Sequence, residues 1–76
     1  MTDVEIEYCV PCGFRNQALD VQQAILSGLE TKLDSVSLVM GDHGVFRVFV
    51  DDSVVYDKAV DDFDVDEIVR EVRAQT

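Results

Sequence analysis

The chain has 76 residues, of which 16 are acidic, 6 are basic and 47% are hydrophobic, so it carries a net charge of −10 and can form the core of one domain, residues 1–76. The charge argues against nucleic acid as a partner, because binding it requires a basic surface that displaces counterions. No stretch approaches the roughly 18 apolar residues of a membrane helix, and the acidic N-terminus MTDVEIEY lacks the build of a secretory signal, so we expect a cytoplasmic protein.

The first predicted elements are a strand and a long helix. The sequence VEIEY, residues 4–8, alternates between apolar and acidic side chains, as a half-buried strand does. A helix is predicted from about residue 14 to residue 32, because apolar residues recur there at helical spacing. These residues are Ala18, Val21, Ile25 and Leu29, with Leu19, Leu26 and Leu33 beside them. Gly28 destabilises a helix relative to alanine, and it therefore predicts a close contact between this helix and the sheet.

Three more strands and a second helix follow. The strands are SVSLVM (residues 35–40), VFRVFV (45–50) and VVYD (54–57), and the turns between them are GDHG (41–44) and DDS (51–53). In the second helix, DVDEIVREV, Asp64 and Glu67 have the spacing of a capping box.

The order of these elements, β-α-β-β-β-α, predicts the fold class. The first strand–helix–strand unit is long enough for a parallel, right-handed crossover, and the later strands form an antiparallel hairpin. We expect an α/β protein of the two-layer α+β kind, with a mixed four-stranded sheet and two helices on one face.

The acidic residues are spread along the chain, and three interpretations of them stay open. A dispersed acidic surface with only two lysines is typical of a halophilic protein, in which concentrated salt screens the self-repulsion. The same composition also fits an ordinary solvated surface or a docking face for a basic partner.

Both cysteines lie in the segment YCVPCGFRN, residues 8–16, on either side of the only proline, Pro11. A disulfide between Cys9 and Cys12 would stabilise the fold little, because a bridge acts mainly by restricting the unfolded chain and this loop is short. Zinc needs three or four protein ligands, and the two thiols with the only histidine, His43, give three at most. We expect no cofactor and no metal within one chain, and zinc bridging a dimer is a minor alternative.

A redox dithiol explains this segment best. Cys-x-x-Cys between a strand and a helix places the first thiol at or before the helix N-terminus, where N–H groups and the helix dipole lower a thiol pKa below about 8.5. Pro11 suits the first helical turn, because its missing N–H has no helical partner there. Phe14 is expected to cover one side of the dithiol. Arg15 could add positive potential, although a solvated helix residue is the preferred interpretation.

Two segments together are distinctive: YCVPCGF (8–14), and GVFRVFVDDSVVYDK (44–58) with its terminal Lys58. They resemble the Tyr-Cys-x-x-(Sec or Cys)-Gly-aromatic motif and the Gly-x-Phe-x-Val hairpin of the thioredoxin-like family of selenoproteins W, T and H and their cysteine-containing prokaryotic relatives, called Rdx. The order of elements fits that family over the whole chain. The resemblance implies a thioredoxin-like fold and thiol-based redox chemistry, here in a prokaryotic, halophilic archaeal member.

The resemblance also implies which residues form the site. Cys9 and Cys12 are the implied catalytic pair. The supporting residues come from the two motifs and are Pro11, Gly13, Phe14, Gly44 and Phe46. The sulfur that attacks first stays open, since thioredoxin mechanics favour Cys9 whereas the selenocysteine of many relatives corresponds to Cys12. Both routes end in a disulfide between the two.

The chain departs from thioredoxins because Pro11 is its only proline, so no second proline can stand beside the dithiol. The turn at residues 41–44 is expected to border the site instead, and its glycines to let a substrate approach closely. His43 is expected to be an exposed turn residue, with proton transfer as the alternative. Arg47 stands where relatives often have an acid.

These features predict an intracellular thiol–disulfide redox protein that acts on protein thiols or low-molecular-weight thiols, without nucleic acid or membrane partners and as a monomer. Whether it turns over as an oxidoreductase or only senses oxidation is left open. The alternative function is a non-enzymatic, acidic interaction module whose thiols are incidental or regulatory.

Overall fold

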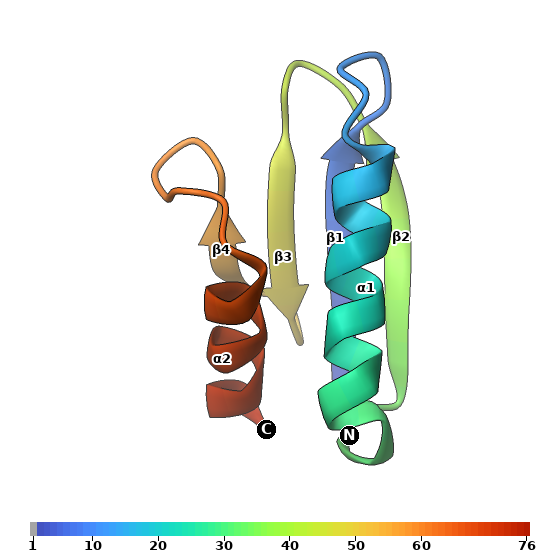
Figure 1. Ribbon diagram of the computed structural model, residues 1–76, viewed down its shortest axis with the longest axis vertical. Helices are drawn as coiled ribbons and strands as arrows, with labels where there is room; N and C mark the ends of the chain where they lie inside the picture. Colours follow the sequence, from blue (N-terminus) through green and yellow to red (C-terminus); the bar gives the residue numbers. More distant parts are fainter. Residues whose placement is uncertain (1) are drawn as a thin grey trace.

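The computed structural model describes residues 2–76, so Met1, the first residue of the expected domain, lies outside it. The predicted order of elements is confirmed (Figure 1). In chain order the elements are β1 (Asp3–Cys9), α1 (Arg15–Leu29), the short 3₁₀ helix η1 (Glu30–Lys32), β2 (Ser35–Gly41), β3 (Phe46–Val50), β4 (Ser53–Asp57) and α2 (Val65–Gln75). Within the described part of the chain, no helix has both the length and the hydrophobicity to cross a membrane.

The four strands form one mixed sheet in the order β2-β1-β3-β4. β1 pairs with β2 in parallel, while β3 pairs antiparallel with β1 on one side and with β4 on the other. Both helices cover the same face of this sheet, α1 over β1 and β2 and α2 beside β4 (Figure 1). The expected two-layer α+β fold is therefore confirmed, and the parallel crossover explains why the β1–α1 junction lies at one end of the sheet.

The core lies between the sheet and the two helices, as the apolar periodicity predicts. Alternate residues of β1 and β3 are buried, and so is the predicted stripe of α1. The buried set comprises Val4, Ile6, Tyr8, Ala18, Val21, Ile25, Leu29, Phe46, Val48, Val50, Tyr56, Ile68 and Val72, together with Cys9. The other face of the sheet carries Arg47, whose guanidinium lies 3.3 Å from Asp57 and 3.9 Å from Glu7 on the neighbouring strands.

The β3–β4 hairpin is tighter than expected. Its connection consists of two residues, Asp51 and Asp52, and Ser53 already belongs to β4. Both aspartates have positive φ, 48° and 72°, which matches the twist that a two-residue hairpin requires. Aspartate tolerates this left-handed backbone better than most residues, so the three-residue turn inferred from DDS is wrong by one position.

The predicted capping of α2 by Asp64 is confirmed. The second hydrogen bond of the predicted capping box, in which the Glu67 side chain would accept, is wrong. The Asp64 carboxylate accepts the N–H groups of Asp66 at 3.0 Å and Glu67 at 3.3 Å. The Glu67 carboxylate accepts instead from the Arg70 guanidinium at 2.8 Å, since a charged donor lies one turn away. Asp64 therefore caps this helix without the second hydrogen bond of a capping box.

Gly28 of α1 is exposed, and a Cβ placed on it would lie 3.5 Å from the guanidinium of Arg73. The expected close contact between Gly28 and the sheet is therefore wrong, because this position faces α2 rather than a strand.

Candidate active site

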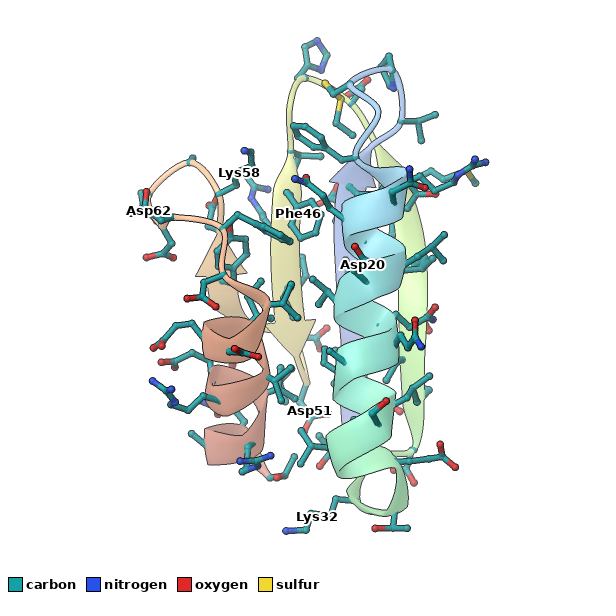
Figure 2. The ribbon with its side chains drawn as sticks, in the orientation of Figure 1. Asp20, Lys32, Phe46, Asp51, Lys58 and Asp62 are labelled. Carbon is teal, nitrogen blue, oxygen red and sulfur yellow. A yellow bond between two sulfur atoms is a disulfide. The ribbon has the colours of Figure 1, made fainter. Side chains whose placement is uncertain are left out.

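Cys9 and Cys12 form a disulfide, with their Cα atoms 5.4 Å apart. Cys9 is the last residue of β1, and Cys12 lies in the turn that leads into α1. Figure 2 shows the two sulfur atoms beyond the end of the sheet, beside the turn that joins β2 to β3. The expected placement of the dithiol between a strand and a helix is thus confirmed.

The two cysteines differ in exposure. Cys9 is 0% exposed, and its N–H donates to the carbonyl of Val45 at 2.8 Å. Cys12 belongs to the exposed surface of the turn. A molecule in solution can therefore reach the disulfide from the side of Cys12, while Cys9 is held within the sheet.

The turn between β1 and α1 is closed by two backbone hydrogen bonds. The N–H of Gly13 donates to the carbonyl of Val10 at 3.1 Å, and the N–H of Phe14 to that of Cys9 at 3.4 Å. Gly13 has φ +78°, a left-handed backbone that glycine adopts without strain. This backbone interrupts any helical path between Pro11 and α1. Pro11 therefore lies in the turn, and its expected place in the first helical turn is wrong.

Gly41, the last residue of β2, borders the dithiol, as expected. Gly41 pairs with Cys9 in the sheet, and its carbonyl accepts the N–H of Val10 at 3.1 Å. A Cβ on Gly41 would lie 2.8 Å from Cγ1 of Val45 and 3.3 Å from the side chain of Glu7. The space beside Gly41 is thus occupied by the protein's own side chains, so the expected open approach for a substrate is wrong at this glycine. The open glycine of the turn is Gly44, with φ +77°, where an added Cβ would have no atom within 4 Å.

Phe14 packs beneath the turn on Phe46, with the ring centroids 6.2 Å apart and edge to face. The ammonium of Lys58 lies 5.1 Å from the centroid of the Phe14 ring, within the range of a cation–π contact. The N–H of Lys58 also donates to the carbonyl of Phe46 at 2.9 Å. Sequence reasoning noticed Lys58 only as the end of the hairpin motif, because its contact with Phe14 depends on the register of β3 and β4.

A hollow of about 420 Å³ adjoins the dithiol turn. Its lining consists of Tyr8, Val10, Gly13, Arg15, Asn16 and Met40. Val10 and Met40 are 48% and 75% exposed, so two exposed apolar side chains line this hollow beside the dithiol turn. Arg15 is the one charged residue of this lining, so the hollow beside the dithiol turn carries a positive charge on an acidic protein. This hollow was not found from the sequence, because the parallel pairing of β1 with β2 is what brings Met40 beside residues 8–16.

His43 is exposed, as expected, and its Nδ1 lies 2.6 Å from a carboxylate oxygen of Asp42. Between residues 2 and 76, no group of three histidine, cysteine or acidic side chains is arranged to hold a metal ion.

The Rdx family model matches residues 3–74, which is nearly the whole chain and includes the dithiol and the hairpin. The chain belongs to the Rdx family. A comparison with curated protein sequences gives no significant match. The family membership confirms the resemblance that the two motifs indicate.

Two solved structures resemble this Rdx protein closely. A protein from Bordetella parapertussis is 27% identical, with a TM-score of 0.92 and coverage of 99% of this chain and 98% of that chain. A selenoprotein W-related protein from Vibrio cholerae is 18% identical, with a TM-score of 0.89 and coverage of 97% and 95%. The fold is thus the thioredoxin-like fold of these proteins, and the disulfide occupies its strand–helix junction.

Proposed function

We propose that this Rdx protein is a thiol–disulfide redox protein of the cytoplasm, which exchanges with protein thiols or low-molecular-weight thiols through Cys12. The observation that carries the proposal is the asymmetric disulfide, in which Cys12 is exposed and Cys9 is buried. Thiol–disulfide exchange requires in-line attack on one sulfur, so access decides which sulfur takes part.

When a partner reduces the Cys9–Cys12 disulfide, the partner's thiolate attacks Sγ of Cys12. The new S–S bond joins the partner to Cys12, the Cys9–Cys12 bond breaks, and its electron pair leaves with Cys9 as a thiolate. A second thiolate then attacks the partner's sulfur and releases Cys12. Two electrons have passed to the protein, and the partner's two thiols have become one disulfide.

In the opposite direction, the Cys12 thiolate attacks a partner disulfide, and Cys9 resolves the mixed disulfide by attacking Sγ of Cys12. Cys9 is suited to the resolving step because β1 and the hydrogen bond to Val45 hold it beside Cys12. The left-handed Gly13 joins the turn to α1, and its N–H closes the turn by donating to the carbonyl of Val10. Phe14 and Phe46 support that turn from the core side.

The apolar hollow beside the turn suits an extended cysteine-containing segment of a protein substrate. Val10 and Met40 offer it contact area, and Met40 adapts to differently shaped side chains because its thioether chain is flexible.

A redox titration tests the proposed function. The purified protein is equilibrated in thiol–disulfide buffers, trapped with an alkylating reagent and weighed by mass spectrometry. A reversible two-electron couple is expected with a midpoint between about −120 and −300 mV, the range of known exchange proteins. The double variant Cys9→Ser/Cys12→Ser is the control and should take up no label. If the wild-type disulfide did not open anywhere in this range, the redox function would be refuted.

We also propose that the protein works in concentrated salt, since its charge of −10 on 76 residues is self-repelling at low ionic strength. The far-UV circular dichroism is expected to show loss of structure on dialysis into low salt and its recovery in molar KCl. The same experiment in sucrose separates charge screening from general stabilisation by excluded solutes. A spectrum unchanged from low to molar salt would contradict this proposal.

A further inference from the structure

The sheet has two edge strands, β2 and β4, and only β4 has features that prevent pairing with a further strand. The pairing of β4 with β3 contains a register shift between Val48 and Phe49, and β4 ends at the charged Asp57. Bulges and charges are the usual means by which proteins block an edge strand. β2 has neither, since its seven residues SVSLVMG contain no charge and no proline and pair with β1 without a shift. This edge is thus uncharged in a chain of which 29% is charged.

Alternate residues of β2 direct their main-chain groups away from the sheet. The carbonyl of Gly41 accepts an N–H of the turn after β1 at 3.1 Å, so Gly41 faces β1. Because the main-chain groups of a strand alternate in direction, those of Leu38 and Met40 are directed toward the open side. Val36 faces the same side, and its carbonyl accepts from the side-chain amide of Gln22 on α1 at 2.9 Å. Leu38 and Met40 therefore offer N–H and C=O groups to an additional strand.

Exposed apolar side chains lie along the same edge. The hydrogen bond from Gln22 to β2 identifies the face of α1 that lies above this edge. Leu19 and Leu26 stand three residues before and four residues after Gln22, so they share that face of the helix. They are 43% and 36% exposed, and Met40 of β2 is 75% exposed. Alternate side chains of a strand added to β2 would pack on these three residues and remove them from water.

The open edge ends beside the dithiol. Gly41, its last residue, pairs with Cys9, and Met40 lines the hollow beside the dithiol turn. Figure 1 shows this end of β2 next to the turn between β1 and α1. Neighbouring strands lie about 4.8 Å apart, so a strand added to β2 would run about 10 Å from Cys9. An extended chain advances about 3.3 Å per residue, so about three residues beyond the paired part span that distance.

We propose that the edge of β2 binds an extended, uncharged segment of the substrate protein as a fifth strand of the sheet, with the reactive cysteine about three residues beyond the paired part. This inference rests on the proposed redox function and specifies its substrate. Main-chain hydrogen bonds to Leu38 and Met40 hold the segment, and Leu19, Leu26 and Met40 favour apolar side chains at alternate positions. A second copy of this chain fits less well, because it would bring its own charge of −10 to the edge.

The kinetics of disulfide opening test the proposal. The probe is the peptide Ac-Val-Thr-Val-Thr-Gly-Gly-Cys-NH₂, together with the reversed order, in which cysteine comes first, since an added strand can run parallel or antiparallel to β2. The controls are the same peptides with every valine and threonine N-methylated, and 2-mercaptoethanol. In each case a thiolate attacks Sγ of Cys12, Cys9 leaves as a thiolate, and a second thiolate releases Cys12, so two thiols become one disulfide.

At least one strand-forming peptide is expected to open the disulfide about tenfold faster than its N-methylated version, because N-methylation removes the main-chain donors and keeps the side chains and the thiol. Equal rates within both pairs of peptides would overturn the proposal and leave the redox function intact. If no thiol opened the disulfide, 2-mercaptoethanol included, the redox function would fail and this inference with it.

A peptide with serine in place of cysteine tests binding apart from the chemistry. It is titrated into the ¹⁵N-labelled protein in molar KCl, and amide hydrogen exchange is measured by NMR. Binding is expected to slow exchange at Leu38 and Met40, whose amides face the open edge, and to leave Val39 unchanged, since its amide faces β1. Unaltered exchange at Leu38 and Met40 would contradict the proposal. Slow exchange there without peptide, increasing with protein concentration, would place a second copy on the edge and would also overturn it.

Met40→Lys and Val54→Lys form a matched pair, because they introduce the same charge at exposed positions of the two edge strands. A lysine on an edge opposes pairing with a further strand. The rate of the strand-forming peptide relative to its N-methylated version is expected to fall from about ten to about one in Met40→Lys and to stay unchanged in Val54→Lys. This ratio is independent of any effect of the new charge on the thiolates, which acts on both peptides alike. A ratio unaltered by Met40→Lys, or lowered equally by Val54→Lys, would exclude the edge of β2 as the site.

Discussion

The Cys9→Ser variant is expected to accumulate mixed disulfides on Cys12, whereas the Cys12→Ser variant is expected to accumulate none. In the first variant the exposed thiol remains and the resolving thiol is missing, so an attacked partner cannot be released. In the second variant the remaining thiol is buried at the end of β1, and thiol exchange should fall to the background of the assay. The measurement is capture of partners from a lysate by each tagged variant, followed by non-reducing electrophoresis and mass spectrometry.

The control for this comparison is the double variant, which shows what the acidic surface captures without any thiol. Partners released by a reductant from Cys9→Ser and absent from the double variant are thiol substrates. If Cys12→Ser trapped partners and Cys9→Ser did not, Cys9 would be the attacking sulfur, as in the thioredoxin order. Such a result would leave the redox function intact and refute the role of exposure.

Phe46→Ala is expected to lower the free energy of unfolding by about 3–5 kcal/mol, a large share of the roughly 5–15 kcal/mol of a small protein. Phe46 is 1% exposed and is the centre of an aromatic cluster. Its ring lies 6.2 Å from Phe14, 6.0 Å from Tyr56 and 5.6 Å from Phe63, in each case edge to face. Truncation removes these contacts and leaves a cavity that a tightly packed core cannot close.

Urea unfolding followed by circular dichroism at constant salt measures this loss. Phe46→Leu is expected to cost less because it keeps more of the volume. Val54→Ala is the surface control, because Val54 is 54% exposed and its truncation should stay within about 0.5 kcal/mol. A loss for Phe46→Ala no greater than that of Val54→Ala would show that the cluster contributes little to stability. The midpoint potential of the Cys9–Cys12 couple in Phe46→Ala, measured under conditions in which the variant is folded, reports separately on the support that Phe46 gives to the dithiol turn.

The patterns that were predicted correctly are local. The apolar stripe of α1 and the alternating burial of β1 and β3 could be predicted because apolar residues recur about every 3.6 residues in an amphipathic helix and every second residue in a strand. The position of the dithiol at a strand–helix junction could be predicted for the same reason, since Cys9 and Cys12 lie between the strand pattern of β1 and the helix pattern of α1. The family resemblance came from two short motifs, and the Rdx match over residues 3–74 supports it.

Errors arose where local preferences compete with one another. The left-handed Gly13 delayed the start of α1 to Arg15 and left Pro11 in the turn. Glu67 had two available donors, the backbone at the start of the helix and Arg70, and it took the charged one. Gly28 indicated a close contact between α1 and another element. Which element makes that contact depends on how α1 and α2 pack, and the neighbour is Arg73 of α2.

The sequence by itself thus determined the elements, their order and the position of Cys9 and Cys12 between a strand and a helix, because these follow from neighbours along the chain. Only the tertiary structure decided that Cys9 is buried against the carbonyl of Val45 while Cys12 is exposed. It also decided that β2 lies at an open, uncharged edge of the sheet beside the dithiol. Burial and long-range pairing depend on strand register and helix packing, which bring distant segments together, and no spacing within a single segment contains that information.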